Sequence, residues 1–143
     1  MISLSIARKL KAAGLQWKPT LFDFFAIPDR EMDERVFVIS DMPATVERYF
    51  GTQVVSFQGA SEWALDSLVT SEAIWLPSEA QLRGMLEDGL IAVGAAGFRL
   101  SADLGGYTCE LLLNLGRMVF RAQEASEAYA LALLYLMNDP PPD

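Results

Sequence analysis

Residues 73–90 constrain the fold most, because several local signals in this stretch agree. Residues 74–76 form an apolar run typical of a strand, and Pro77 ends that run because proline donates no backbone hydrogen bond. Ser78 has the position of a helix N-cap, and Gln81 lies at the spacing of a capping box. The stretch therefore predicts a strand, a turn and a helix.

The predicted helix spans residues 78–88 and has one apolar face. The apolar residues of that face, at spacings of three and four, are Leu82, Met85 and Leu86. Gly89 stands where a helix commonly takes a left-handed terminator. Because the apolar face must be buried, we expect this helix to lie on a sheet that includes Trp75.

Similar signals place two further helices near residues 3–13 and 124–137. Strand-like runs separated by short turns fill much of the remaining chain. These runs are residues 21–27, 36–40, 45–49, 52–57, 74–76, 91–93, 98–100, 107–113 and 117–122. The segment 62–68 is compatible with either a helical turn or a strand. Parallel pairing would require long crossovers, so we expect an α+β fold in which antiparallel sheets pack against about three helices.

The chain length of 143 residues suits a single compact domain. A weak internal similarity suggests two halves, residues 1–70 and 71–137, although helices with similar caps also match by chance. The matching positions are Ser3, Arg8, Leu10, Gly14 and Leu15 with Ser78, Arg83, Met85, Gly89 and Leu90. The proline-rich end, residues 138–143, cannot continue a helix, and we expect it to fray.

Composition excludes several functional classes. The chain has no histidine and one cysteine, which removes Ser-His and Cys-His catalytic arrangements, cysteine-built metal sites and an intramolecular disulfide. A net charge of −8 disfavours nucleic acid as a partner. No apolar run reaches membrane-spanning length and no signal-peptide pattern is present, so we expect a cytoplasmic protein without a membrane partner.

Few residues are candidates for chemistry, and we assign no catalytic, cofactor-binding or metal-binding residue. Acidic residues gather in the segment 29–34, but without the spacing of a calcium loop, and a solvated loop explains them. Cys109 alternates with apolar neighbours, which indicates a small core residue and not a nucleophile. A candidate pocket combines three tryptophans with two aspartates that could act as an acid and base pair, although core packing and turn capping explain them too. Its residues are Trp17, Asp41, Trp63, Asp66 and Trp75.

The C-terminal helix carries more apolar surface than one stripe requires. Residues at flanking positions, Leu131, Leu134 and Tyr135, form a candidate interface. Contact between two copies would bury this surface twice, so the sequence predicts a homodimer. The N-terminal helix, through Ile6 and Leu10, is an alternative cover within one chain.

Several stretches resemble a family of small uncharacterised bacterial proteins, some automatically named "pilus assembly protein". They are residues 25–30, 36–42, 62–67 and 74–77. The end of the chain, residues 120–122 and 127–134, is similar to small phage-associated proteins of unknown function. The resemblance implies no activity and no site residues. Because the sequence has no histidine, no metal-ligand cluster and no nucleophile motif, we predict a non-enzymatic protein-binding or regulatory module, with a small-ligand-binding protein or a carboxylate-based enzyme as the alternative.

Overall fold

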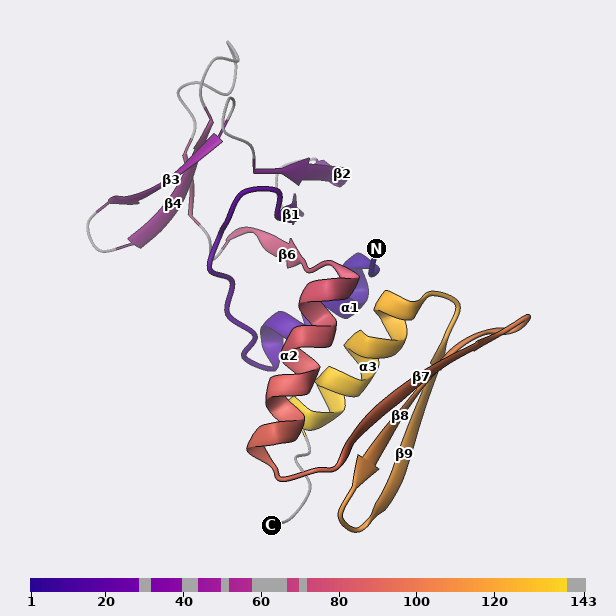
Figure 1. Ribbon diagram of the computed structural model, residues 1–143. Helices are drawn as coiled ribbons and strands as arrows, with labels where there is room; N and C mark the ends of the chain where they lie inside the picture. The colour runs from indigo at the N-terminus through magenta and orange to yellow at the C-terminus, as the bar shows by residue number, and fades with distance from the viewer. Residues whose placement is uncertain (29–31, 40–43, 50–51, 58–66, 70–71, 139–143) are drawn as a thin grey trace. The chain divides into compact units, whose positions relative to one another are not determined.

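The computed structural model describes residues 1–28, 32–39, 44–49, 52–57, 67–69 and 72–138, with the backbone alone for 32–35 and 44–69. The chain divides into two compact units. One unit, here called the helical unit, contains Met1–Leu15 and Pro77–Asp143, and the other, the inserted unit, is Gln16–Leu76. Figure 1 shows the elements of both. All strand pairs in the described residues are antiparallel, which confirms the predicted α+β class.

The helical unit begins with α1 (Leu4–Ala12), whose N-cap Ser3 accepts a hydrogen bond from the Ile6 amide. Helix α2 (Glu79–Ala92) begins with the predicted capping box. Its two hydrogen bonds join Ser78 N to Gln81 Oε1 at 2.9 Å and Gln81 N to Ser78 Oγ at 3.1 Å. Both predicted helix starts are therefore confirmed.

Helix α2 does not end at Gly89, and the predicted strand at 91–93 is wrong. The helix continues to Ala92, and Gly94, with φ of +69°, ends it as Ala95 N donates to Leu90 O at 3.0 Å. Gly89 instead faces α3 (Ala125–Asn138), where a Cβ atom would lie 3.4 Å from Leu136 Cδ1. The missing side chain allows the two helices to approach closely.

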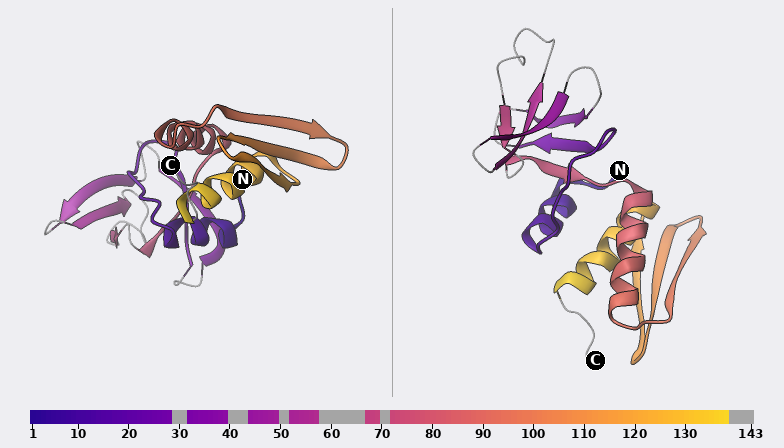
Figure 2. Two further views of the ribbon diagram at one scale, coloured as in Figure 1. Left: turned by 90° about the horizontal axis from the view of Figure 1, so that it is seen from below. Right: turned by 60° about the vertical axis from the view of Figure 1, so that its left-hand side comes forward.

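Strands β7 (Gly97–Asp103), β8 (Gly106–Leu113) and β9 (Gly116–Ala122) form a meander in the order β7-β8-β9. Helix α3 packs against β8 and β9, and α2 packs against α3 and β7 (Figures 1 and 2). Alternate residues of β8, including Cys109 and Leu111, are buried toward the helices. Leu82, Leu86 and Leu90 complete this core from α2. Trp75 belongs to β6 (Ile74–Leu76), which is not a strand of the sheet that α2 contacts, so the expectation that α2 lies on a sheet containing Trp75 is wrong.

The inserted unit contains two small sheets. Strands β1 (Phe24–Ile27), β2 (Met32–Val38) and β6 (Ile74–Leu76) form one in the order β2-β1-β6. Strands β3 (Ala44–Tyr49), β4 (Thr52–Phe57) and β5 (Ser67–Val69) form the other in the order β3-β4-β5. Strand β2 begins at Met32, so part of the predicted charged loop 29–34 is extended and pairs with β1. The segment 62–68 contributes its last two residues to β5.

Candidate interaction surface

A tight turn before β1 replaces the start of the predicted strand 21–27. Asp23 N donates to Thr20 O at 3.2 Å, which closes the turn over Leu21 and Phe22. Phe22 N donates to Ile39 O at 2.7 Å, and Ile39 N donates to Asp23 O at 3.0 Å. Residues 20–23, here called the Phe22 turn, are thereby joined to the residue that follows β2.

The Asp23 side chain holds this turn from inside. Its Oδ2 atom accepts hydrogen bonds from Trp17 Nε1 at 2.9 Å and from Thr20 N at 3.0 Å. Asp23 is only 4 % exposed, and a buried carboxylate requires such donors. One carboxylate therefore fixes both the turn and the indole ring that precedes it.

Phe22 has an unusual backbone conformation and an unusual environment. Its φ of +71° lies in the left-handed region, which residues other than Gly, Asn and Asp rarely adopt. The phenyl side chain is also 73 % exposed, so its burial in the described structure does not offset the strain. Strained backbone of this kind costs about 1–3 kcal/mol and is concentrated at functional sites.

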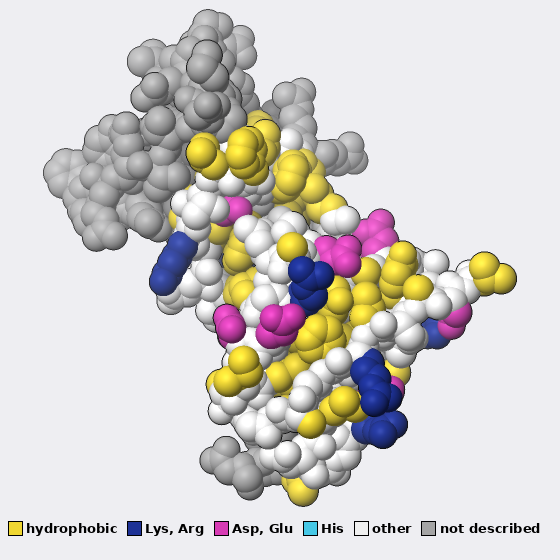
Figure 3. Space-filling model, in the orientation of Figure 1, with side chains coloured by type: hydrophobic (Ala, Val, Ile, Leu, Met, Phe, Trp, Pro, Cys, Tyr) yellow, Lys and Arg dark blue, Asp and Glu magenta, His cyan; other side chains and the backbone are white. Residues whose placement is uncertain are grey.

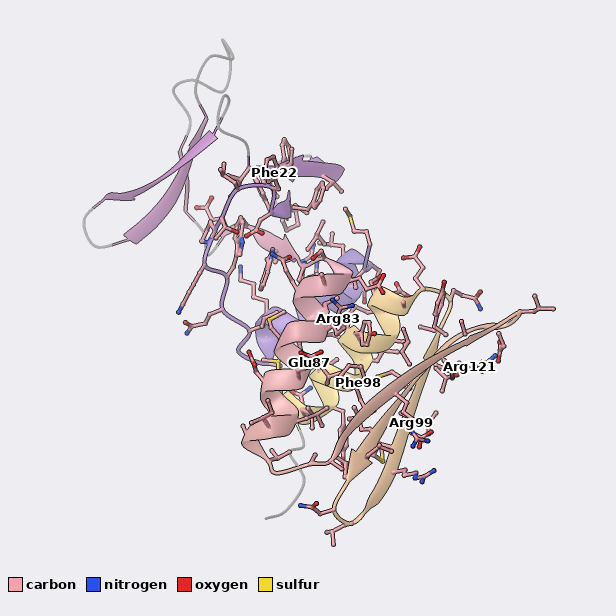
Figure 4. The ribbon with its side chains drawn as sticks, in the orientation of Figure 1. Phe22, Arg83, Glu87, Phe98, Arg99 and Arg121 are labelled. Carbon is pink, nitrogen blue, oxygen red and sulfur yellow. The ribbon has the colours of Figure 1, made fainter. Side chains whose placement is uncertain are left out.

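Further apolar side chains are exposed close to the Phe22 turn. They are Leu21, Phe24, Val36 and Val38. Phe24 lies opposite Val38 in the β1–β2 register, so both point to the same face of the sheet. Figure 3 shows apolar side chains gathered at the surface around the position that Figure 4 labels Phe22. We call these five residues, Phe22 included, the apolar patch.

The opposite face of the same sheet is an aromatic core. The Phe25 ring lies 5.3 Å from the Trp17 ring and 5.5 Å from the Phe37 ring, measured between centroids. Trp75 lies opposite Phe25 in the β1–β6 register. Its Nε1 atom is buried, and no hydrogen-bond partner for it is found among the described residues.

Only two residues of the candidate pocket, Trp17 and Trp75, belong to the described part of the chain. The Trp17 ring packs against the Phe25 ring, and Trp75 lies opposite Phe25 in the β1–β6 register. Asp41, Trp63 and Asp66 lie outside the described residues. Sequence reasoning missed Phe22 and Asp23, although three phenylalanines in four positions exceed what one face of a strand can bury.

The candidate interface residues on α3 are all half-buried. Tyr135 packs against Phe120 of β9, with ring centroids 5.6 Å apart. Helix α1 also packs against α3, and its Leu10 is fully buried. The alternative to a dimer, a contact of α1 with α3, is therefore present, and the dimer through Leu131, Leu134 and Tyr135 stays a prediction.

The described residues offer no other site with evident chemistry. Cys109 is fully buried, and desolvation raises the pKa of its thiol to about 11, which makes it a poor nucleophile. Within the described ranges, no three acidic or cysteine residues are grouped so that they could hold a metal ion. Across the same ranges, every helix is too short or too polar to span a bilayer. Comparison with protein-family models, curated proteins and solved structures found no match.

Proposed function

We propose that this chain is a non-enzymatic protein-binding module and that its partner docks on the apolar patch. The observation that carries the proposal is Phe22, which is strained at the backbone and exposed at the side chain. Neither property stabilises the folded chain, whereas a rigid exposed aromatic ring is a typical anchor of a protein interface. The partner that fits is a protein with an apolar pocket, because the patch residues carry no charge.

The turn around Phe22 is suited to such a contact. The Asp23 carboxylate already holds the Thr20 amide on the amino side of Phe22, and Ile39 O accepts a hydrogen bond from the Phe22 amide. Ordering the turn on binding would therefore require little conformational entropy. Phe24 and Val38 extend the apolar surface beyond the turn onto the β1–β2 strand pair.

Two serine substitutions test this proposal. Leu115 lies in the β8–β9 turn and is 78 % exposed, so Leu115→Ser is a matched control for Phe22→Ser. The purified wild-type chain and both variants are used to capture proteins from an extract of the producing cells, and the affinity of the captured protein is then measured. We expect one specific protein to bind the wild type and Leu115→Ser, and to bind Phe22→Ser at least about tenfold more weakly. Equal affinity for Phe22→Ser and the wild type would contradict the docking site.

The alternative function is a small-ligand-binding protein or an enzyme that uses Asp41 or Asp66. The buried Trp75 Nε1 atom, which has no hydrogen-bond partner among the described residues, favours this alternative, since a ligand acceptor could satisfy it. Thermal unfolding in the presence of metabolite and metal libraries separates the two functions, because a ligand of the native state raises the melting temperature. A saturable shift that Trp75→Phe abolishes would favour the alternative.

A further inference from the structure

The β7-β8-β9 sheet of the helical unit has two edges with different charge patterns. On the face turned away from the helices, β7 presents Arg99, Ser101 and Asp103 in turn. On the same face, β9 presents Arg117, Val119 and Arg121. The sign of the charge thus reverses along β7 but not along β9. Figure 4 shows Arg99 on the side of β7 opposite to Phe98, which points toward the helices.

The outer edge of β7 is unpaired in the described part of the chain. The sheet order makes β7 a terminal strand, and no described backbone group donates to or accepts from its outer side. Such an edge presents a row of free N–H and C=O groups and can pair with another strand.

We propose that a second copy of this chain pairs with β7 in antiparallel fashion, about a two-fold axis at Ser101. Antiparallel self-pairing reverses the residue order, so Arg99 of each copy lies opposite Asp103 of the other. Two complementary pairs therefore form across the axis. Self-pairing of β9 about Val119 would instead oppose Arg117 and Arg121, which repel each other. This proposal concerns residues other than the apolar patch and does not depend on the proposed function.

Arg99 and Asp103 on β7 can each take part in a further ion pair. Arg117 and Arg121 have ion-pair partners, Glu110 at 3.2 Å and Asp103 at 2.8 Å, whereas Arg99 has none among the described residues. Asp103 Oδ1 accepts from Gly105 N and Arg121 Nη2, while Oδ2 accepts the longer Arg121 Nη2 contact of 3.1 Å. Asp103 Oδ2 can therefore accept a further donor.

The same register also covers apolar surface. Beyond the five paired residues, it brings Leu104 of one copy alongside Phe98 of the other. Leu104 is fully exposed at the β7–β8 turn, and Phe98 is half-buried with its ring 5.7 Å from that of Tyr129. Contact between the two side chains would remove both from water.

Cysteine cross-linking tests the register in the full-length chain. Ser101→Cys places two thiols opposite each other at the axis, and Val119→Cys on β9 is a control on the same face that is also exposed. The native Cys109 does not interfere, because it is fully buried. We expect mild oxidation at micromolar concentration to convert Ser101→Cys to a covalent dimer and to leave Val119→Cys monomeric. A monomeric Ser101→Cys, or equal cross-linking of both variants, would overturn the proposal.

Charge exchange tests the paired residues. Arg99→Asp alone places two acids opposite each other at each pair, and Asp103→Arg alone places two arginines opposite each other. Each variant should therefore weaken the dimer at least about tenfold. A mixture of the two variants restores both complementary pairs, and sedimentation should show the mixed dimer. Circular dichroism confirms that each variant is folded. Folded variants that dimerise as the wild type does, or a mixture that stays monomeric, would contradict the assigned pairs.

Discussion

Phe22 and Asp23 are adjacent residues with opposite relations to stability. Asp23 is buried and accepts two hydrogen bonds that hold the turn, whereas Phe22 is exposed and strained. The protein thus uses a stabilising carboxylate to maintain a conformation that the neighbouring residue disfavours. This division of roles is the physical basis for assigning Phe22 to binding.

Replacement of Asp23 should destabilise the inserted unit. Asp23→Ala removes the acceptor for Trp17 Nε1 and Thr20 N, and leaves both donors without it in a partly buried site. We expect a loss of roughly 2–3 kcal/mol in the free energy of unfolding. Urea unfolding followed by tryptophan fluorescence measures this loss. Asp23→Asn retains an acceptor oxygen and should lose less, and a loss as large as that of Asp23→Ala would contradict the hydrogen-bonding role.

Cys109 should make the helical unit less stable in alkali. Burial raises the pKa of the folded-state thiol from 9.0 to about 11, so the folded state favours the neutral form. This contribution is fully present below pH 9 and is lost as pH rises through 11, with about 2 kcal/mol lost by pH 10.5. Urea unfolding at pH 8 and pH 10.5, followed by helical circular dichroism, measures it. Burial also raises the pKa of Tyr129, so a variant without the thiol is needed as a control. Between pH 8 and pH 10.5, Cys109→Ala should lose less stability than the wild type, and the difference is the contribution of the thiol.

At the level of elements, local sequence signals located helix starts better than helix ends. The Ser3 and Ser78 side chains each accept a hydrogen bond from the amide three residues ahead, and both caps were predicted correctly. Gly89 is the residue type that commonly ends a helix, but here it allows close packing against Leu136, which is distant in sequence. The Phe22 turn had no local signal, because a positive φ normally selects glycine or asparagine.

Two glycines of the helical unit should respond oppositely to alanine. At Gly106, with φ of +130°, a Cβ atom would lie 2.5 Å from Ala122 O, so Gly106→Ala should cost about 2–3 kcal/mol. At Gly84, inside α2, a Cβ atom would meet nothing within 4 Å, and Gly84→Ala should gain about 1 kcal/mol in helix propensity. Urea unfolding followed by circular dichroism at 222 nm measures both. Equal changes in the two variants would contradict the packing around Gly106.

At the level of the whole molecule, the chain forms one unit from its two ends and a second unit from residues 16–76. The sequence indicated the antiparallel α+β class, because turns are short throughout. It indicated the contact of α1 with α3 only as an alternative to a dimer, because the packing of the buried Ala7 and Leu10 does not follow from a local pattern. The candidate pocket was limited in the same way, because Trp75 comes to lie opposite Phe25, which packs against Trp17, only through strand pairing.

Because the chain divides into two units, tryptophan fluorescence and circular dichroism report on different parts of it. All three tryptophans lie within residues 16–76, and all described helices lie in the helical unit. Tryptophan fluorescence therefore reports on the inserted unit, where the apolar patch lies. Circular dichroism at 222 nm reports mainly on the helical unit and serves as an internal control.

The central claim is that Phe22 is retained for contact with a partner and not for stability, and Phe22→Gly tests it most directly. Glycine tolerates a φ of +71°, so relief of about 1–3 kcal/mol of strain should exceed the roughly 0.5–1 kcal/mol entropic cost of glycine. We expect urea unfolding followed by tryptophan fluorescence to show equal or higher stability for Phe22→Gly, with binding of the captured partner lost. A loss of more than about 1 kcal/mol would show that the ring stabilises the fold and would contradict the claim.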